Sequence, residues 1–546
     1  MKWVLLFVPM AISSWILLFS CSLPLVEDAE ITLGKSDWLK DIVWEVQAID
    51  PYTVKIEWNS TSYTRPNSQI VLERKSLLDS KFVEIGQVGF EIGYFRDVDL
   101  SPDHNYSYRI KLNDQGVDTE FSLPKRIKTF PLVELGQFLI LDTLFSGGSK
   151  GDKSYPSISL AYSLDTYESG KFSGGPVRFD IGTGRFRLVK IEDEWSFVDP
   201  EGYLFFGAGV NSVPAAEQFT SIKLPSDLRN LGFNHLANWS AFESINQVGP
   251  PMPYTSRVLF LAGYKNLEVR TKELYAKGVI PIFDQAFYNY ADQMAKLVEE
   301  DFSRDPYCIG IFSDNELPLY SNERYGDLLE RFLNIEDKED PNFKAAREWL
   351  FQRNGTYEVS SITSTDRYDW HGYLASTYYS IVHQALKRHA PDVLYLGSRL
   401  HGAAKNYANI FKESAPYVDV FSINFYGPHQ PEFDQISLWE NGTDKPFMIT
   451  EFYAKGFDVE LDNSGGAGFH VPSQKDRALY YENFVMRLIS RKNCVGYQWF
   501  RFQDDSSNKG LVNKEETWYQ PLTTSVKKIN SDLYNLRKFL LYDYVF

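Results

Sequence analysis

The stretch Tyr307-Cys308-Ile309-Gly310-Ile311-Phe312-Ser313-Asp314-Asn315-Glu316 begins as an apolar run and ends abruptly in three polar residues. A short apolar run of this kind is typical of a strand buried on both faces of a parallel sheet. Pro318 comes two residues after Glu316 and stops the strand from continuing. In α/β barrels the functional groups sit at such strand ends. Since Asp and Asn also begin ordinary loops, the stretch alone leaves a purely structural interpretation open.

The rest of the chain from residue 204 alternates strand-like and helix-like segments in the same way. The strand candidates are residues 204–213, 232–238, 279–284, 308–313, 393–398, 418–424, 447–450 and 495–500. The clearest helix covers residues 373–388, where apolar side chains fall on one stripe and Pro391 follows. Eight parallel-type strands separated by helices predict a (β/α)8 TIM barrel over residues 204–546.

The N-terminal segment has the pattern of an export signal. Residues 1–20 carry Lys2 followed by a long apolar run, as a secretory signal peptide does. The ending Leu18-Phe19-Ser20-Cys21 resembles a bacterial lipobox, so Cys21 is the expected lipidation site and residues 21–36 a tether. An uncleaved membrane anchor is the alternative. We therefore expect an exported protein, an outer-membrane or cell-surface lipoprotein facing the periplasm or the exterior of a bacterium.

Between the tether and the barrel, short alternating strands dominate. Residues 37–130 show period-two runs separated by turn signals, which predicts a β-sandwich. The motif Asp97-x-x-Leu100-x-Pro102-x-x-x-Tyr106-x-Tyr108 resembles a fibronectin type III domain. Residues 131–203 are expected to form a linker and then a β-hairpin, turning at Pro200-Glu201-Gly202, that caps the lower end of the barrel.

Composition excludes some classes of function. The 546-residue chain has a formal net charge of −16, which argues against nucleic-acid binding. After Cys21 the chain has two cysteines, Cys308 and Cys494, expected as buried apolar residues without a disulfide. No cluster of His, Cys and acidic residues has the spacing of a catalytic metal site, so no metal or cofactor is expected, and a structural Ca²⁺ is left open.

Two glutamates follow strands that are not neighbours in a barrel. Glu316 follows the fourth predicted strand and Glu451 the seventh, so the two are expected to face each other across the mouth. Glycosidic hydrolysis needs two carboxyl groups flanking the bond, one as acid and one as nucleophile or base. Their surroundings must differ, so that one can be protonated while the other is ionised.

Further polar and aromatic residues follow the other predicted strands. The candidates for binding the substrate are Asn238, Trp239, Asp284, Asn315, Arg399, His401, Asn424, Tyr426 and Trp499. Asn315 can hold a sugar hydroxyl, Tyr426 can donate to Glu451, and Trp499 can form a stacking floor. Arg399 and His401 can bind a hydroxyl or a sulfate, or else orient one of the glutamates. Asn211 is a possible lining residue, and Asp314 a support or sugar contact. His235 lies within a strand and is expected to be a core residue.

These strand ends are similar to those of the retaining glycoside hydrolases of clan A. The segments Trp195-Ser196-Phe197-Val198-Asp199-Pro200-Glu201-Gly202, Ile309–Leu317 and Val495-Gly496-Tyr497-Gln498-Trp499-Phe500 resemble β-agarases, especially glycoside hydrolase family 50, with family 86 as a cousin. The resemblance implies Glu316 as acid/base and Glu451 as nucleophile, with carboxyl groups roughly 5–5.5 Å apart. It also implies a flexible loop over the cleft at residues 465–468.

The substrate implied by this resemblance is a β-linked red-algal galactan of the agarose or porphyran type, or its oligosaccharides. The chain departs from the agarase pattern at its front, where the fibronectin-like module stands in place of a jelly-roll-like domain. The exact family and substrate therefore stay open. The alternatives are another clan A glycosidase acting on carrageenan, mannan or glucan, and a non-catalytic surface glycan-binding lipoprotein.

Overall fold

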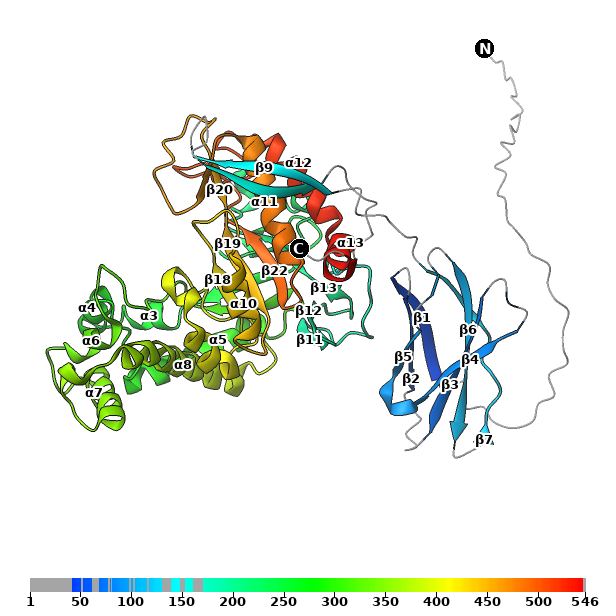
Figure 1. Ribbon diagram of the computed structural model, residues 1–546, viewed down its shortest axis with the longest axis horizontal. Helices are drawn as coiled ribbons and strands as arrows, with labels where there is room; N and C mark the ends of the chain where they lie inside the picture. The colour runs from blue at the N-terminus through cyan, green and yellow to red at the C-terminus, as the bar shows by residue number, and fades with distance from the viewer. Residues whose placement is uncertain are drawn as a thin grey trace, which may run out of the picture. The chain divides into compact units, whose positions relative to one another are not determined.

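The computed structural model describes residues 42–50, 53–60, 68–76, 79, 81–97, 100–101, 104–114, 117–129, 139–147, 153–160 and 170–543. The chain divides into two compact units, Met1–Phe130 and Pro131–Phe546 (Figure 1). The predicted signal peptide, the tether and the lipidation site Cys21 lie outside the described residues. Among the described helices, none combines the length and the apolar character that crossing a membrane requires.

The first unit consists of two antiparallel sheets. One sheet has the order β1 (Ile42–Asp50), β2 (Thr53–Ser60), β5 (Tyr94–Asp97), and the other β4 (Val83–Gly89), β3 (Gln69–Ser76), β6 (Asn105–Asp114), β7 (Val117–Asp118), with β8 (Lys125–Lys128) paired to β6. A 3-10 turn, η2 (Phe90–Ile92), precedes β5. Val54, Ile56 and Trp58 alternate along β2 and meet Tyr108 and Ile110 of β6 in one core. This alternation is the period-two pattern of the sequence.

The second unit is built on a parallel sheet of seven strands. Their order is β17 (Cys308–Ser313), β16 (Tyr254–Val258), β15 (His235–Leu236), β14 (Gly207–Val210), β22 (Cys494–Trp499), β19 (Phe447–Phe452) and β18 (Phe421–Asn424). Every pairing in this sheet is parallel, and helices separate the strands along the chain. The fold of this unit is therefore an α/β barrel, as the alternation of segments predicts.

The two edges of this sheet are joined by the segment 394–400, which is not a regular strand. Ile311 of β17 donates its amide to Leu394, and the Leu396 amide donates back to Ile311, both bridging the first edge. At the other edge Leu400 donates to Ser422 of β18 and accepts from the Asn424 amide. The predicted strand at 393–398 thus occupies the fifth position, but its backbone is too irregular to form a continuous ladder.

The predicted third strand is wrong. Residues 279–284 do not pair in the sheet, and β16 (Tyr254–Val258) holds that position. Ile280 and Ile282 are fully buried, but they pack in the core ahead of helix α5 (Gln285–Phe302), for which Asp284 is the N-cap. An apolar run alone does not distinguish these two kinds of burial. The true strand contains Thr255, Ser256 and Arg257, so it lacks the continuous apolar pattern.

The remaining helices cover the barrel. They are α1 (Ser226–Asn230), α2 (Phe242–Ile245), α3 (Leu261–Tyr264), α4 (Val269–Ala276), α6 (Leu328–Leu333), α7 (Pro341–Asn354), α8 (Ser364–His389), α9 (Ala408–Ser414), α10 (Phe433–Asn441), α11 (Gln474–Ile489), α12 (Gln520–Ser531) and α13 (Leu533–Lys538). Short 3-10 turns are η4 (Ala216–Gln218), η5 (Val359–Ser361), η6 (Gly402–Asn406) and η7 (Ala415–Tyr417), and η8 (Phe539–Asp543) is a π-helix. Helix α8 contains the predicted helix 373–388 and extends it at the N-terminus.

A small antiparallel sheet closes the lower end of the barrel. It consists of β11 (Arg187–Ile191), β12 (Glu194–Val198) and β13 (Leu204–Phe205). Its Phe197 and Phe205 are fully buried and share a core with Phe312 and Met448, which come from the barrel strands β17 and β19. These apolar side chains fill the interior from below, so the polar groups of the barrel gather at the opposite end.

Residues interpreted as a plain linker contain a further hairpin, β9 (Leu139–Ser146) and β10 (Lys153–Leu160). It lies along α11, where Asn483 accepts from the Ile158 amide and Glu482 from the Leu160 amide (Figure 1). A two-stranded parallel pair, β20 (Ala454–Gly456) and β21 (Phe469–Val471), lies nearby. Cys308 and Cys494 are buried and unbridged, as predicted, and burial raises the pKa of both thiols.

Candidate active site

A cleft of about 570 Å³ opens at the carboxyl ends of the barrel strands. Its lining residues are Ser212, Pro214, Gln218, Trp239, Asn315, Glu316, Glu451, Phe500 and Arg501. These residues follow or end the strands β14, β15, β17, β19 and β22, so the cleft is assembled from segments far apart in the sequence. The two glutamates that the sequence singles out both lie in it.

The backbone around the cleft is strained at several positions. Ser212, Trp239, Asp314, Glu316 and Arg399 have φ values of 55°, 68°, 59°, 53° and 58°. Residues other than glycine seldom adopt this left-handed conformation, and when they do they concentrate at functional sites. Each of the five follows a barrel strand or lies within the segment 394–400, so the strain coincides with the rim of the cleft.

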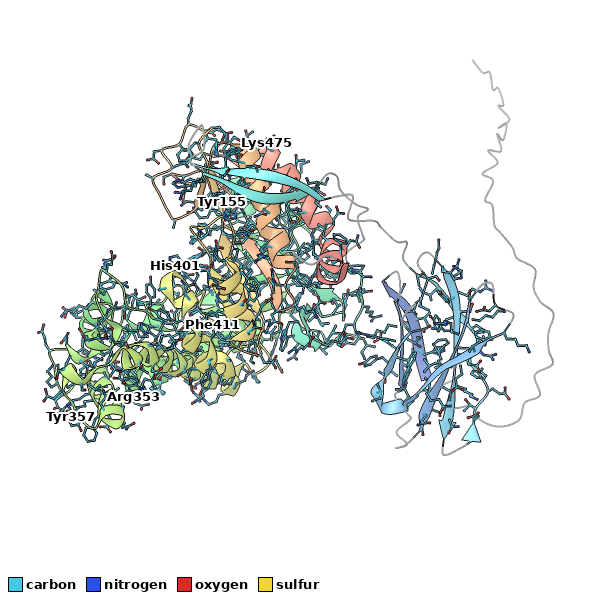
Figure 2. All side chains as sticks on the ribbon, viewed as in Figure 1. Tyr155, Arg353, Tyr357, His401, Phe411 and Lys475 are labelled. Carbon is cyan, nitrogen blue, oxygen red and sulfur yellow. The ribbon has the colours of Figure 1, made fainter. Side chains whose placement is uncertain are left out.

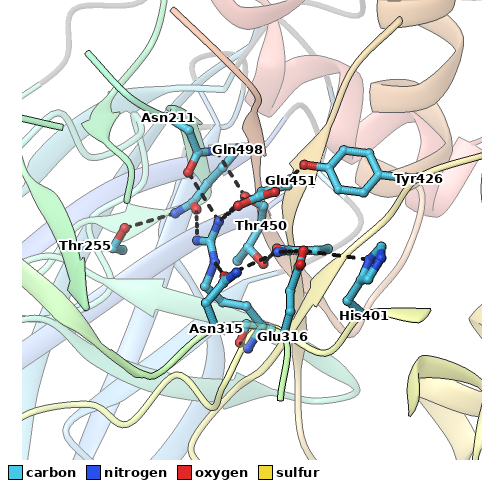
Figure 3. A network of polar contacts seen from close by, with 12 residues as sticks. Asn211, Thr255, Asn315, Glu316, His401, Tyr426, Thr450, Glu451 and Gln498 are labelled. Atoms are coloured by element: carbon cyan, nitrogen blue, oxygen red, sulfur yellow. Dashed lines mark hydrogen bonds and ion pairs between the residues drawn. The ribbon is translucent and has the colours of Figure 1, made fainter. Parts of the chain in front are cut away.

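Glu451 is held by two donors (Figure 3). The guanidinium of Arg399 pairs with Oε1, and the hydroxyl of Tyr426 donates to Oε2. Burial and the neighbouring Glu451 raise the pKa of Tyr426 well above its usual value, so the phenol stays protonated and remains a donor. The predicted contact between Tyr426 and Glu451 is therefore present, and both oxygens of the carboxylate are fixed in direction.

Arg399 is the centre of a buried polar network. Its side chain is fully buried, and its Nε donates to Asn315 Oδ1 at 2.8 Å. Its Nη2 lies 3.3 Å from the Thr450 carbonyl and 3.5 Å from Asn211 Oδ1. The same side chain thus connects Glu451 to the residue that precedes Glu316. Since it is buried, Arg399 orients the site and does not bind substrate, which was the alternative role left open for it.

Glu316 has different surroundings. Its Oε1 accepts a hydrogen bond of 2.7 Å from Asn424 Nδ2, and His401 Nδ1 lies 3.7 Å away. The Glu316 side chain is 31% exposed, whereas that of Glu451 is 7% exposed. Asn424 is itself buried and accepts from Thr450 Oγ1 at 2.8 Å. It therefore positions Glu316, and the prediction that it contacts the substrate is wrong.

Below the glutamates, a layer of polar side chains crosses the barrel interior. Gln498 Nε2 is 3.0 Å from His235 Nε2 and donates to Thr255 Oγ1 at 3.1 Å (Figure 3). His235 is fully buried, and burial lowers its pKa to about 3, so it is neutral. This agrees with its interpretation as a core residue. The layer supports Arg399, whose Nη1 lies 3.5 Å from Gln498 Oε1.

Asp314 supports the rim and makes no contribution to the cleft lining. It is fully buried and accepts from the amides of Leu261 and Ala262 and from the Tyr378 hydroxyl, at 2.7, 2.8 and 2.6 Å. Of the two roles considered for it, the structure supports that of a structural support.

Three further predicted substrate contacts, Trp499, Asp284 and Asn238, are buried. Trp499 is fully buried, with its indole Nε1 donating to the Lys509 carbonyl at 3.1 Å, so it cannot form a stacking floor. Asp284 is 3% exposed and accepts from Tyr264, Arg270 and Asn342, because it caps α5 and does not end a barrel strand. Asn238 is buried too, and the cleft is lined by its neighbour Trp239.

Five lining residues have no counterpart among the predicted contacts: Ser212, Pro214, Gln218, Phe500 and Arg501. Phe500 follows Trp499 directly, so the apolar wall lies one residue further along the chain than expected. Trp499 is the last residue of β22 and Phe500 lies just beyond it, and the sequence does not show which of the two side chains faces the cleft.

The glycine-rich segment at residues 465–468 is tied down. Lys455 Nζ donates to the carbonyls of Asn463 and Gly466 at 3.0 and 2.8 Å, and the Gly465 amide donates to Ser507 Oγ at 3.0 Å. These contacts join the loop after β19 to the loop after β22. Within the described residues no group of three or more His, Cys, Asp or Glu side chains is arranged to hold a metal ion.

Comparison with known proteins finds β-agarases that are similar to the chain. No protein-family model matches the chain. It is 26% identical over 472 residues to β-agarase B and 25% identical over 356 residues to β-agarase A, both from Vibrio sp. (strain JT0107). These alignments cover 65% and 56% of this chain, but only 49% and 35% of the relatives. The chain thus spans half or less of the length of the curated relatives it matches.

Solved structures agree with these relatives. The crystal structure of BpGH50 is 29% identical, with a TM-score of 0.65, and the match covers 73% of this chain and 96% of that one. An exo-β-agarase structure shares the fold at 16% identity, with a TM-score of 0.56 and coverage of 91% and 97%. The chain is similar to β-agarases in both sequence and fold, as the residues at its strand ends predict.

Proposed function

We propose that the chain is a retaining glycoside hydrolase that cleaves β-linked galactans of the agarose or porphyran type. The observation that carries this proposal is the position of Glu316 and Glu451, which come from different strands and line one cleft. The similarity to β-agarases supports the choice of substrate. The cleft also offers Trp239 and Phe500 as apolar surfaces against which sugar rings can pack.

In the first step Glu451 attacks the anomeric carbon while Glu316 protonates the leaving oxygen. A bond forms between the Glu451 carboxylate and the sugar, and the glycosidic C–O bond breaks. Arg399 and Tyr426 suit Glu451 to this role, because both act as donors to its oxygens and fix their direction. Glu316 is more exposed, so it can reach the leaving oxygen and exchange its proton with solvent.

In the second step water hydrolyses the glycosyl–Glu451 ester. Glu316, now ionised, removes a proton from the water, the C–O bond to Glu451 breaks, and Glu316 regains its acidic form. His401 lies next to Glu316 and faces the ring of Tyr426, with 5.7 Å between the ring centroids. Asn315, which is held by Arg399, borders the reacting carbon and is available for a sugar hydroxyl.

The test uses neutral agaro-oligosaccharides and single amide substitutions. Glu316→Gln and Glu451→Gln remove one carboxyl each with little change of shape, and each is expected to lower kcat/KM by about 10²–10⁴-fold or more. Glu348→Gln, on the exposed face of α7, is the matched control and is expected to keep wild-type activity. Full activity in either cleft variant would overturn the proposed mechanism.

We further infer that the first unit is a fibronectin type III-like spacer. Two observations support this. The unit has one sheet of three strands and one of five. The Tyr106 hydroxyl accepts from the Ser101 amide at 2.9 Å, which fixes the corner before β6. Export and lipidation at Cys21 complete the proposal, supported by the lipobox-like residues 18–21. Metabolic labelling with a fatty acid, compared between wild type and Cys21→Ser, tests the anchor.

A further inference from the structure

Arg257 is a cation of the barrel interior to which the sequence-based predictions and the proposed mechanism assign no role. It is the fourth residue of β16, two positions after Thr255. Side chains two apart on a strand point to the same side. Because Thr255 binds Gln498 inside the barrel, Arg257 projects into the same interior, one layer nearer the mouth. It therefore lies in the layer of Arg399 and Glu451.

The guanidinium of Arg257 stacks on a wall of the cleft. Its Cζ lies 3.5 Å from the centroid of the Trp239 ring, and it is Trp239 that lines the cleft, with 46% of its surface exposed. Stacking on an indole fixes the plane of the guanidinium while leaving the N–H groups at its edge available. Arg257 is thus pre-oriented, and its donors are not used by the stacking.

Among the described residues, the charges of Asp314 and Glu451 act on Arg257 without forming a direct ion pair with it. Within the part of the chain that the structure describes, no ion pair joins Arg257 to a carboxylate, whereas Arg399 pairs with Glu451. Burial and the neighbouring charge of Arg399 lower the pKa of Arg257 to about 10, although the carboxylates of Asp314 and Glu451 act to raise it, so the side chain remains protonated at neutral pH. A half-buried cation of this kind has a strong requirement for an anionic partner.

A second cation lies on the same cleft. Arg501 lines it and shares the carboxylate of Asp505 with Lys509, at 3.3 and 2.9 Å. Two cations therefore depend on one acid. In a chain with a formal net charge of −16, one arginine without a direct ion pair and two cations that share one acid are a local exception that favours an anionic ligand.

We propose that Arg257, held against Trp239, binds an oxyanion substituent of the sugar chain in the cleft, a sulfate ester or a carboxylate, with Arg501 as a second cation. This inference rests on the proposed function and names the substrate class within it. An oxyanion offers two oxygens to the guanidinium fork and supplies the missing negative charge. A sugar hydroxyl offers one oxygen and leaves the buried charge uncompensated.

The experiment measures binding separately from hydrolysis. Titration calorimetry is performed on full-length Glu316→Gln protein with three sets of oligosaccharides of equal length: neutral agaro-oligosaccharides, sulfated porphyran oligosaccharides, and oligosaccharides carrying a uronate. We expect one anionic set to bind at least tenfold more tightly than the neutral set, and the set that does so identifies the oxyanion. The preference is expected to shrink as ionic strength rises.

Arg257→Gln added to this background is expected to abolish the preference, with less than a twofold change for the neutral set. Arg257→Lys keeps the positive charge but loses the forked guanidinium, and it is expected to retain part of the preference for the anionic set. The matched control is Arg347→Gln, since Arg347 also stacks on an aromatic ring, 4.0 Å from the centroid of Tyr357. Tyr357 lies well apart from His401 (Figure 2). It is expected to bind as the background does.

Equal affinity of the Glu316→Gln protein for neutral and anionic sugars would overturn the inference, and this result does not depend on whether the Arg257 variants fold. An equal loss of affinity for all three sets of oligosaccharides in a folded Arg257 variant would also overturn it. Either result leaves the proposed function standing if wild type cleaves the neutral sugars and the glutamate variants do not. Conversely, an anionic preference together with full activity of Glu451→Gln would overturn only the proposed mechanism.

Discussion

At the scale of single residues, the site depends on Arg399, a side chain with no contact to solvent. It joins Glu451, Asn315 and the polar layer beneath them, so the direction of the proposed nucleophile and the position of a sugar contact are set by one group. Tyr426 adds the second bond to Glu451. Such a network is stabilising only while every member is present.

Arg399→Met leaves the Glu451 carboxylate buried without its cation. The free energy of unfolding is therefore expected to fall by about 3–5 kcal/mol. In Arg399→Met/Glu451→Gln that uncompensated charge is absent, so part of the loss is expected to return while activity does not. Denaturant unfolding of the four proteins measures the coupling, with the exposed Arg347→Met as control, expected within about 0.5 kcal/mol of wild type. Additive losses would contradict a direct pairing of the two groups.

The residue types at the strand ends predict Glu316, Glu451, Tyr426 and Asn315 correctly as members of one cluster, because the chemistry of the position restricts what can stand there. They do not separate the residues that border the cleft from those that support them. Arg399 and Asn424 proved to be buried. Trp499 and Phe500 are adjacent aromatic residues, and Trp499 is turned away from the cleft by its packing against Lys509, Phe452 and Tyr481.

At the scale of elements, the long helix α8 is fixed at its start by a capping box. Thr363 accepts from the Asp366 amide at 3.1 Å, and Asp366 accepts from the Thr363 amide at 2.8 Å. Burial alone would raise the pKa of Asp366, but hydrogen bonds from Thr363, Asn354 and Arg353 outweigh it and hold the pKa well below its usual range. The ionised carboxylate therefore stabilises the folded state.

Asp366→Asn is expected to lower Tm at neutral pH. Since the pKa is depressed in the folded state, this stabilisation is complete above the ordinary aspartate pKa of about 3.9 and is lost as the pH falls towards the folded value. The difference in Tm between wild type and variant should be constant from pH 6 to 8 and shrink below about pH 4. The control is Asp369→Asn, because Asp369 is an exposed partner of the same Arg353 and its substitution is expected to change Tm less. A difference in Tm that does not depend on pH would contradict this assignment.

Elements with a strong local pattern are predictable, and those without one are not. Helix α8 and strands β17, β18, β19 and β22 follow their periodicity or apolar runs. Strand β16 does not, because Thr255 and Arg257 serve the polar interior of the barrel instead of an apolar core. The sequence pattern therefore predicts the third strand at residues 279–284, which is wrong, and with it predicts Asp284 as a residue of the site. The hairpin of β9 and β10 was missed because its contacts with α11 come from over three hundred residues away.

At the scale of the whole molecule, every residue of the cleft belongs to the second unit. Apolar side chains of β12 and β13 fill the lower barrel, the layer around Gln498 and His235 crosses the middle, and the glutamates occupy the mouth. This order explains why the polar groups at the strand ends predict a site: in a barrel filled from below, only the carboxyl ends remain open to a ligand.

The most direct test of the proposed double displacement is the configuration of the first product. Proton NMR spectra are recorded within the first minutes of hydrolysis of a neutral agaro-oligosaccharide, before the anomers equilibrate. Attack by Glu451 followed by attack of water inverts the anomeric carbon twice, so the β anomer is expected to appear first, and Glu451→Gln to release no product. Initial appearance of the α anomer would contradict the account, because it would mean that water attacks directly.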